Sequence, residues 1–288
     1  MRTILVTGIR GQLGAEVGEI LSPLGEIIGV GREKLDLAKP EQIREAITQI
    51  KPHIIINCGA YTGVDKAESE SDLAYQINGV APTVLAQEAE KLGATLVHIS
   101  TDYVFDGTKN TPYLETDPTH PRGVYGKSKV AGEEGIGQTG AKYYILRTAW
   151  VYGTQGKGNF VKTMLQLGRE KEELGVVMDQ VGTPTWTQDI AKAIASLLQQ
   201  DTPRGTYHFT NSGVTSWYDF AVAIFEEALL LGLPLQVKRV VPITTSEYPT
   251  PARRPAYSVL DTRKLGAVLG EYPPHWRVSL RKMLEEGV

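Results

Sequence analysis

The amino-terminal segment constrains the fold of this chain more than any other part of the sequence. Residues 2–7 are apolar and β-branched over the length of a strand, and Gly8, Gly11 and Gly14 follow directly. Residues 15–24 then repeat apolar side chains at helical spacing. A strand, a glycine-rich turn and a helix form the first half of a dinucleotide-binding unit, because the glycines let the backbone approach a pyrophosphate at the helix N-terminus. The spacing is Gly-x-x-Gly-x-x-Gly and not the general Gly-x-Gly-x-x-Gly.

Strand-like and helix-like segments alternate through the first half of the chain. We expect strands at residues 3–6, 26–30, 54–57, 95–100 and 143–148. We expect helices at residues 12–24, 40–51, 70–79, 81–92 and 124–135. Such alternation predicts an α/β fold with a doubly wound parallel sheet, whose ligand lies outside the carboxyl ends of the strands.

The regular alternation ends after Trp150, which predicts a smaller α/β lobe in the carboxyl-terminal part. A glycine-rich loop at 153–159 precedes expected helices at 160–174, 187–200, 216–231 and 278–286 and expected strands at 176–186, 205–210 and 237–243. We assign residues 1–170 and about 187–211 to a dinucleotide-binding domain, and about 171–186 and 212–288 to a substrate lobe. The stiff, basic segment 249–255 is either a solvated connection or a wall of a pocket for an anionic substrate.

Composition excludes several classes of function. The 288 residues carry a net charge of -3, so there is no electrostatic footprint for nucleic acid or an anionic membrane. No stretch reaches the ~20 apolar residues of a membrane span, and no signal peptide is visible. The single cysteine, Cys58, excludes an internal disulfide, fits a reducing cytoplasm and is expected to be a small buried apolar residue. The histidines have no metal-binding spacing, so we expect no catalytic metal; they are His53, His98, His120, His208 and His275.

Tyr125 and Lys129 are the candidate acid–base pair. They stand four residues apart in an expected helix, and residues at that spacing share a helix face. A free phenol has a pKa near ~10, and an adjacent cation favours the phenolate and lowers that pKa toward neutrality. A solvated helix face is the alternative for such a pair.

The end of the second expected strand predicts the choice of dinucleotide. It reads Gly31-Arg32, where an acidic residue would bind the ribose of NAD and an arginine would accept the 2′-phosphate of NADP. Arg10 in the glycine loop adds a second positive charge, and Asp36 and Leu37 are placed to hold the adenine edge. We therefore predict NADPH, with NADH as the alternative, although Arg32 could also be a solvated loop residue.

Several longer motifs resemble a known family. They are Gly11-Gln12-Leu13-Gly14, the run from Asn57 to Glu68, Ser100-Thr101-Asp102-Tyr103-Val104-Phe105-Asp106-Gly107, Arg147 to Gly153, and Asp179 to Thr185. Together with the Tyr-x-x-x-Lys pair they resemble the dTDP-4-dehydrorhamnose reductases of the extended short-chain dehydrogenase/reductase superfamily, which have a Rossmann sheet. The resemblance runs in register to about residue 200 and is looser beyond.

The resemblance implies a reaction and its residues. NADPH would reduce the 4-keto group of dTDP-4-dehydro-β-L-rhamnose, with Tyr125 as the proton donor and Thr101 as a hydrogen-bond donor to the same oxygen. Lys129 would lower the pKa of the phenol and hold the nicotinamide ribose. Asp102 and Tyr103 would contact the sugar, and Trp150 would form the wall of the sugar site unless it is plain core.

The cofactor residues follow from the same resemblance. Gly8, Arg10, Gly11, Gln12, Leu13 and Gly14 would form the phosphate loop, and Ala60-Tyr61-Thr62 would run under the cofactor, together with Gly31, Arg32, Asp36, Leu37, Tyr125 and Lys129. Asn78 is a helix-end residue or a structural hydrogen bonder near the site. Some members use a divalent ion at a dimer contact. Glu16 is the candidate ligand here, but the second position reads Gln188, so we assign no such metal, and a homodimer stays open.

Two other functions fit parts of the sequence. Nucleotide-sugar epimerases and dehydratases share the glycine loop and the Tyr-x-x-x-Lys pair, but dehydratases place an Asp-Glu pair after the Ser/Thr where this chain has Asp102-Tyr103. The regulatory subunit of methionine adenosyltransferase resembles the same reductases without being an enzyme. Because Thr101, Tyr125 and Lys129 are all present, we favour the reductase.

Overall fold

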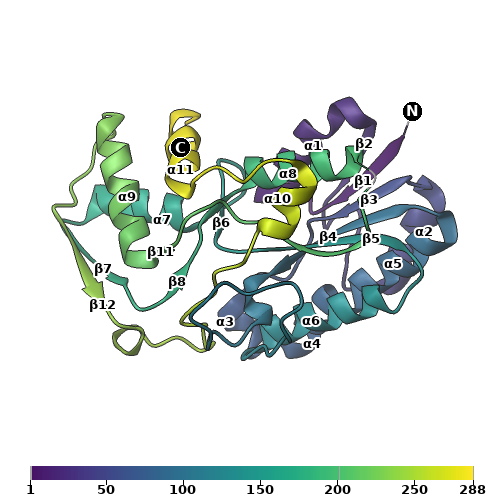
Figure 1. Cartoon of the computed structure of the whole chain (residues 1–288), viewed down its shortest axis with the longest axis horizontal. Helices are drawn as coiled ribbons and strands as arrows, with labels where there is room; N and C mark the ends of the chain where they lie inside the picture. Colours follow the sequence, from purple (N-terminus) through teal and green to yellow (C-terminus); the bar gives the residue numbers. More distant parts are fainter. Residues whose placement is uncertain (1, 201, 288) are drawn as a thin grey trace.

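A parallel sheet forms the centre of the computed structural model, which describes residues 2–200 and 202–287. Residues 1, 201 and 288, included in the predicted domains, lie outside the described residues. The six strands run in the order β10-β5-β4-β3-β1-β2, all parallel (Figure 1). They are β1 Thr3–Thr7, β2 Glu26–Val30, β3 Ile54–Asn57, β4 Thr95–Thr101, β5 Lys142–Thr148 and β10 Gly205–His208. The predicted doubly wound α/β fold is therefore confirmed.

Helices cover both faces of this sheet. On one face lie α1 (Gln12–Ile20), α8 (Thr187–Gln199) and α10 (Arg263–Leu269), and on the other lie α2 (Pro40–Ile50), α5 (Ala81–Leu92) and α6 (Val124–Gly137). Successive strand residues point to opposite faces, so Ile4 and Val6 enter the first hydrophobic cluster while Leu5 enters the second. Helix α10 was not predicted.

The order of the strands reverses between β1 and β3. The chain passes from β1 outward to β2 and then returns across β1 to β3 and β4. In an open α/β sheet this reversal leaves a crevice at the carboxyl ends of the two central strands. Gly8 follows β1 and Cys58 follows β3, so the glycine loop borders the crevice, as the sequence predicts.

The expected helix at 70–79 contains a wide, π-helical turn. After the short helix α3 (Val64–Ala67), α4 (Ser71–Tyr75) passes through a π-helical turn at Gln76–Val80 into α5, so the helix is continuous to Leu92. Pro82 has no N–H to donate to the carbonyl of Asn78 four residues earlier, and a missing donor of this kind widens a helix locally. The turn carries Asn78 into the interior, where 1% of it is exposed.

Helix α1 is shorter than predicted. The sequence indicates helix to residue 24, but α1 ends at Ile20 and a 3₁₀ turn occupies Ser22–Leu24. Pro23 explains the difference, because it disfavours helical backbone at the residue before it and cannot continue the hydrogen-bond ladder.

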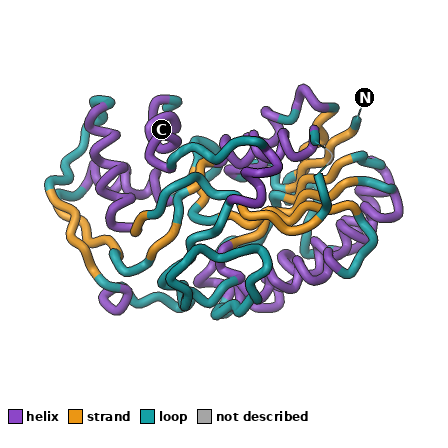
Figure 2. The backbone as a smooth tube through the Cα atoms, viewed as in Figure 1, coloured by secondary structure: helices purple, strands orange, loops and turns teal. Residues whose placement is uncertain are grey.

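The smaller lobe is built from helices α7 (Phe160–Glu170), α9 (Trp217–Leu230) and α11 (Trp276–Glu285), with the parallel strands β7 (Glu173–Val177) and β12 (Arg239–Ile243) along its outer side (Figure 2). Four further strands form two short pairs: β6 Val151–Tyr152 with β9 Thr185–Trp186, and β8 Val181–Gly182 with β11 Thr215–Ser216.

The predicted strand 176–186 is wrong. Residues 173–177 pair with β12, whereas 181–182 and 185–186 pair with two different strands. Pro184 lacks the N–H donor needed to continue one strand ladder.

The expected helix 160–174 is also too long, since Lys171 is already extended.

The boundary between the two parts stays a prediction, but the packing of α7 bears on it. Val161, Met164 and Leu165 of α7 lie in the same hydrophobic cluster as Phe220 of α9 and Leu280 of α11. This favours placing α7 with the substrate lobe, outside the domain of residues 1–170. Within residues 2–200 and 202–287, no helix is both long and apolar enough to cross a membrane.

Candidate active site

The glycine loop folds tightly between β1 and α1. Gly8 has a φ of 67°, which favours glycine, and the Gly11 N–H donates to the Gly8 carbonyl at 2.8 Å. A Cβ at Gly14 would lie 2.1 Å from the Gly8 carbonyl oxygen, and one at Gly8 would lie 2.7 Å from the Gly59 nitrogen. The loop can therefore take no side chains at these positions, and α1 begins directly behind it at Gln12.

A pocket opens beside this loop at the carboxyl ends of β1, β2 and β3. Its lining consists of Thr7, Gly8, Gly31, Arg32, Leu35, Asp36, Leu37, Gly59, Ala60 and Ile77. The structure thus brings six of the predicted cofactor residues around one cavity: Gly8, which is the one member of the glycine loop in this lining, with Gly31, Arg32, Asp36, Leu37 and Ala60. Arg32 is exposed at its edge. The Asp36 carboxylate accepts from the Ala38 N–H at 3.0 Å, so it also shapes the turn after Leu35.

Three predicted loop residues have additional contacts. Arg10 forms an exposed ion pair with Glu33 at 3.0 Å, beside Arg32. The Gln12 side-chain oxygen accepts from Asn159 at 2.7 Å and ties the 153–159 loop to the glycine loop. The Leu13 side chain is packed in the core, so only its backbone can face a cofactor.

Tyr61 and Thr62 leave β3 together but diverge. Tyr61 is buried, and its hydroxyl donates to Glu70 at 2.5 Å. Asn78 holds the Tyr61 backbone from both sides, accepting from its N–H at 2.9 Å and donating to its carbonyl at 3.0 Å. Thr62 is exposed at the start of the turn into α3. Asn78 is therefore a structural hydrogen bonder under the cofactor segment.

Tyr125, Thr101 and Tyr103 meet at the carboxyl end of β4. Tyr125 lies in the first turn of α6, four residues before Lys129. The rings of Tyr103 and Tyr125 pack edge to face with centroids 5.6 Å apart. Thr101 also donates to Asp102 at 3.0 Å and accepts from the Tyr103 N–H at 3.2 Å.

The electrostatics of Tyr125 differ from the sequence-based expectation. Burial raises the pKa of Tyr125 to about 12, opposed by the hydrogen bond to Thr101. Lys129 is not among the groups that shift this pKa, and its Nζ donates to the Ile99 carbonyl at 2.5 Å and lies 3.2 Å from Nε2 of His98. Burial lowers the pKa of Lys129 itself to about 8, opposed by the charge of Glu133.

Asp102 and Trp150 are held by their own neighbours. Asp102 is 2% exposed, and burial raises the pKa of its carboxyl group to about 6, opposed by the hydrogen bond from Thr101. Trp150 has a φ of 48°, and its ring stacks on Trp217 with centroids 3.5 Å apart. A Cβ at Gly182 would lie 2.6 Å from the Trp150 ring. This packing favours a structural role, and the sugar wall stays a prediction.

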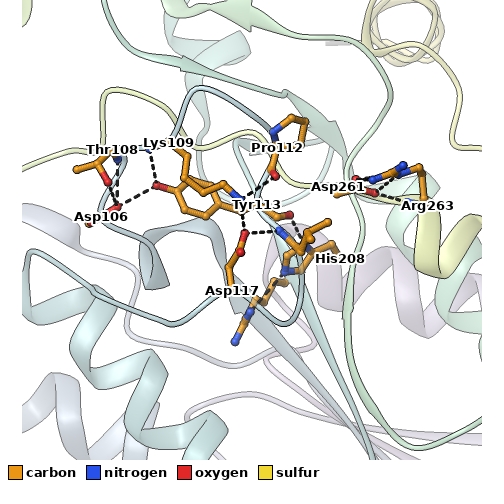
Figure 3. A network of polar contacts seen from close by, with 11 residues as sticks. Asp106, Thr108, Lys109, Pro112, Tyr113, Asp117, His208, Asp261 and Arg263 are labelled. Atoms are coloured by element: carbon orange, nitrogen blue, oxygen red, sulfur yellow. Dashed lines mark hydrogen bonds and ion pairs between the residues drawn. The ribbon is translucent and has the colours of Figure 1, made fainter.

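The segment between Thr101 and Tyr125 is anchored by a polar network (Figure 3). The Tyr113 hydroxyl donates to Asp106 at 2.9 Å, and Lys109 pairs with Asp117 at 2.5 Å. Nδ1 of the buried His208, from β10, lies 3.1 Å from the Tyr113 carbonyl oxygen. The loop is thus fastened to the sheet at Tyr113.

The comparisons with known proteins identify the family. The model of the RmlD substrate binding domain matches residues 1–288. The chain belongs to this family. The dTDP-4-dehydrorhamnose reductase of Burkholderia thailandensis is 45% identical over 287 residues, covering 96% of each chain.

Solved structures agree with this membership. A dTDP-4-dehydrorhamnose reductase from Bacillus anthracis, crystallised with NADP, has a TM-score of 0.92 and 40% identity over 99% of each chain. A UDP-glucose 4-epimerase from Thermus thermophilus, in complex with NAD, has a TM-score of 0.82 over 99% of each chain at 23% identity, and that likeness shows the fold alone.

Sequence reasoning missed buried polar residues behind the site of this RmlD-family chain. Glu133 lies one turn beyond Lys129 on α6 and forms a buried ion pair with Arg147 of β5 at 2.6 Å. Glu133 stands four residues after Lys129, as Lys129 does after Tyr125, and residues at this spacing share a helix face. The spacing was therefore a usable signal for Glu133. His98 had no such signal, since any strand residue can face inward.

Two expectations about charged residues have partial answers. Arg254, from segment 249–255, pairs with Asp65 of α3 at 2.8 Å, so this segment contacts the first domain and is more than a solvated connection. Gln188 donates to Glu286 at 3.0 Å, and burial raises the pKa of the nearby Glu16 carboxyl group. Within residues 2–200 and 202–287, no three His, Cys, Asp or Glu side chains are grouped to hold a metal.

Proposed function

We propose that this protein reduces the 4-keto group of dTDP-4-dehydro-β-L-rhamnose to dTDP-L-rhamnose with NADPH. The observation that carries the proposal is the packing of the Tyr125 ring against Tyr103, whose N–H donates to the Thr101 hydroxyl, at the carboxyl end of β4 in the sheet whose β1 and β3 ends border the glycine-loop crevice. Relatives named for this reaction, one of them 45% identical, support the choice of substrate. Cytoplasmic location and a homodimer stay predictions.

The residues around the crevice fit a dinucleotide. Gly8, Gly11 and Gly14 form a cradle that a Cβ would obstruct, and Arg32 lines the adjoining pocket. The glycine loop and the N-terminus of α1 would hold the pyrophosphate, Arg32 the 2′-phosphate, and Lys129 the nicotinamide ribose. When bound, NADPH would supply the hydride that reduces the keto carbon.

Tyr125 would supply the proton. With its pKa raised to about 12, the phenol is protonated throughout the neutral range. As the keto oxygen gains negative charge it becomes a stronger base than the phenolate, so the proton passes from the Tyr125 hydroxyl to that oxygen. The Lys129 amine is turned to Ile99 and His98, so its proposed part is to hold the nicotinamide ribose and not to lower the pKa of the phenol.

Thr101 would stabilise the same oxygen. Its hydroxyl has one proton, which it donates to Asp102 in the structure. Donation to the keto oxygen therefore requires the hydroxyl to turn from Asp102 toward the substrate. A donor that is already aimed at the oxyanion lowers a barrier by about 3 kcal/mol in other enzymes, and the need to turn from Asp102 makes the contribution of Thr101 smaller than this.

The test is an assay of the purified full-length protein with the dTDP-keto sugar. Loss of NADPH absorbance, faster than loss of NADH absorbance and much slower with the UDP analogue, is the expected result. No oxidation of either cofactor, with stoichiometric NAD retained through purification, would instead support a 4-epimerase. No oxidation together with capture of a synthetase would support the regulatory-subunit alternative.

A further inference from the structure

A row of hydrogen-bonded, buried polar side chains lies beneath the carboxyl ends of β1, β3 and β4. The Thr7 hydroxyl donates to Oδ1 of Asn57 at 2.6 Å, and Nδ2 of Asn57 lies 3.0 Å from Nδ1 of His98. Nε2 of His98 lies 3.2 Å from Nζ of Lys129. None of the four residues is more than 2% exposed. Polar groups this deeply buried must satisfy one another.

This row of four side chains connects the pocket beside the glycine loop to Lys129. Thr7 and Gly59 both line the pocket, and the Gly59 N–H donates to the Thr7 hydroxyl oxygen at 3.2 Å. At the other end, Lys129 also donates to the Ile99 carbonyl. A change in the hydrogen bonding of Lys129 can therefore change, one bond after another, the hydrogen bonds of His98, Asn57 and Thr7 at the wall of the pocket.

The first arrangement of protons requires a neutral lysine. With Thr7 donating to Oδ1 of Asn57, the Asn57 amide nitrogen donates to Nδ1 of His98. The neutral imidazole then carries its proton on Nε2 and donates toward Lys129. Only an uncharged amine has the lone pair to accept it.

The second arrangement belongs to the charged lysine. An ammonium group has three donors and no acceptor, so Nε2 of His98 must accept and the ring proton moves to Nδ1. The Asn57 amide must then turn over, so that its oxygen accepts from Nδ1 and its nitrogen donates to Thr7. A doubly protonated ring is excluded, because burial and Lys129 hold the pKa of His98 well below its usual range.

We propose that His98 is a positioning residue whose tautomer follows the charge of Lys129 and passes that charge state, through Asn57 and Thr7, to the cofactor pocket. The functional consequence rests on the proposed function, in which Lys129 holds the nicotinamide ribose. In the charged state, His98 and the Ile99 carbonyl together direct two of the three ammonium donors, which leaves one for a ligand.

Both the charged and the neutral form of Lys129 can be populated in ordinary buffers. Burial lowers the pKa of Lys129 to about 8. Glu133 on the same helix and Cys58 after β3 act against this lowering, and His98 on β4 faces the amine directly. Tyr125 stands four residues before Lys129 on the same helix, and its pKa lies well above this range.

His208 provides a matched control within the same molecule. It is as fully buried as His98, with Nδ1 3.1 Å from the Tyr113 carbonyl oxygen and Nε2 3.4 Å from a guanidinium nitrogen of Arg147. A carbonyl can only accept and an arginine always remains a donor. His208 must therefore keep its proton on Nδ1 at every pH at which the protein is folded.

The first test is nitrogen-15 NMR of the imidazole rings in the full chain, which has only five histidines. His98→Gln and His208→Gln assign the two signals. The expected result is that the His98 proton moves from Nδ1 to Nε2 as the pH rises through the Lys129 ionisation, near about 8, while His208 does not change. In Lys129→Met, His98 should keep one tautomer.

This measurement reads no catalysis, so it separates the proposal from the proposed function. A His98 ring that keeps one tautomer while the Lys129 amine loses its proton would overturn the proposal. So would a change of tautomer that persists in Lys129→Met.

The second test is the pH profile of kcat. His98→Leu removes the acceptor from the ammonium group, so the alkaline loss of activity should move to lower pH by roughly one pH unit, with kcat at least about tenfold lower. The amide oxygen of His98→Gln can still accept and should return the profile to near its original position. An unchanged profile in both variants, with only thermal stability lowered, would show a merely structural role. If His98→Leu does not fold, His98→Gln and the NMR titration decide.

Discussion

At the scale of single residues, burial and not the neighbouring ammonium group controls Tyr125. The phenol is protonated at neutral pH, as a free phenol is, and burial raises its pKa further, to about 12. A protonated phenol is what a proton donor requires. The proposed role of Lys129 is then to hold the nicotinamide ribose, since its amine is turned to Ile99 and His98.

Replacing the phenol tests this role. Tyr125→Phe keeps the ring against Tyr103, so NADPH should bind within about twofold of the wild type while kcat falls by far more than tenfold, or about 1.4 kcal/mol of barrier. Single-turnover rates and cofactor titration measure the two quantities. A kcat within tenfold of the wild type would contradict the assignment.

Arg32 should read the 2′-phosphate. Arg32→Ala should weaken NADPH by about tenfold or more and leave NADH nearly unchanged, because only NADPH carries the phosphate that a guanidinium group pairs with. Dissociation constants for both cofactors measure this. Lys34→Ala, an exposed cation outside the pocket lining, is the control and should change neither. Equal losses for NADPH and NADH would remove Arg32 from cofactor selection.

Asp102 should make stability depend on pH. Its pKa is raised from 3.8 to about 6 in the folded protein, so the unfolded chain ionises first as pH rises. Stability should therefore fall between about pH 4 and about pH 7, by at most about 3 kcal/mol. Asp102→Asn cannot ionise and should lack this fall. Urea unfolding across that range measures the difference, and parallel curves for the two proteins would show that Asp102 does not titrate as described.

At the scale of elements, the π-helical turn at Gln76–Val80 places a side chain that a regular helix would direct elsewhere. Asn78 reaches the backbone of Tyr61 and the hydroxyl of Ser128, which joins the cofactor segment after β3 to helix α6. The turn thus supports both the wall of the pocket and the helix that carries Tyr125 and Lys129.

Removing this side chain should destabilise the protein measurably. Asn78→Ala leaves the buried N–H and carbonyl of Tyr61 without partners, at a cost of about 2–4 kcal/mol. Gln76→Ala, in the same turn but exposed, should cost less than about 0.5 kcal/mol. Urea denaturation measures both free energies of unfolding. Similar small losses of stability in the two variants would mean that the contacts of Asn78 with Tyr61 do not stabilise the protein.

At the scale of the whole molecule, Asp65 and Arg254 join the two parts of the chain across the site. Both guanidinium Nη atoms contact the carboxylate, at 3.1 and 2.8 Å, and the Ala252 N–H donates to it at 3.1 Å. Arg254 and a backbone bond lower the pKa of Asp65. This pair couples segment 249–255 to the turn that follows Tyr61 and Thr62.

A double-mutant cycle measures this coupling. Asp65→Asn and Arg254→Gln should show an interaction of about 1 kcal/mol in thermal unfolding, smaller in high salt because the pair is partly exposed. The exposed pair Glu172–Lys238 is the control and should show no measurable coupling. Because the pKa of Asp65 is lowered, its contribution is present above about pH 4 and is lost as the pH falls below it. Coupling equal to that of the control pair would remove this contact from the stability of the two-part arrangement.

The sequence was sufficient wherever neighbouring residues decide the structure. The strand, glycine turn and helix at residues 3–20 follow from side-chain periodicity and from the absence of a Cβ at Gly8 and Gly14. The spacing of Tyr125 and Lys129 predicts a shared helix face because the α-helix has a fixed period. The alternation of such units predicts a parallel sheet and the edge at which its ligand lies.

The tertiary structure decided whatever depends on partners distant in the chain. The direction of the Lys129 amine is chosen by His98 and Ile99 on β4, and the pKa of Tyr125 by the water that its neighbours exclude. Residues 173–186 divide among three strand pairs because their partners lie at 151–152, 215–216 and 239–243. Periodicity within one segment carries no record of those contacts, since hydrogen-bond partners and burial exist only once the chain has folded.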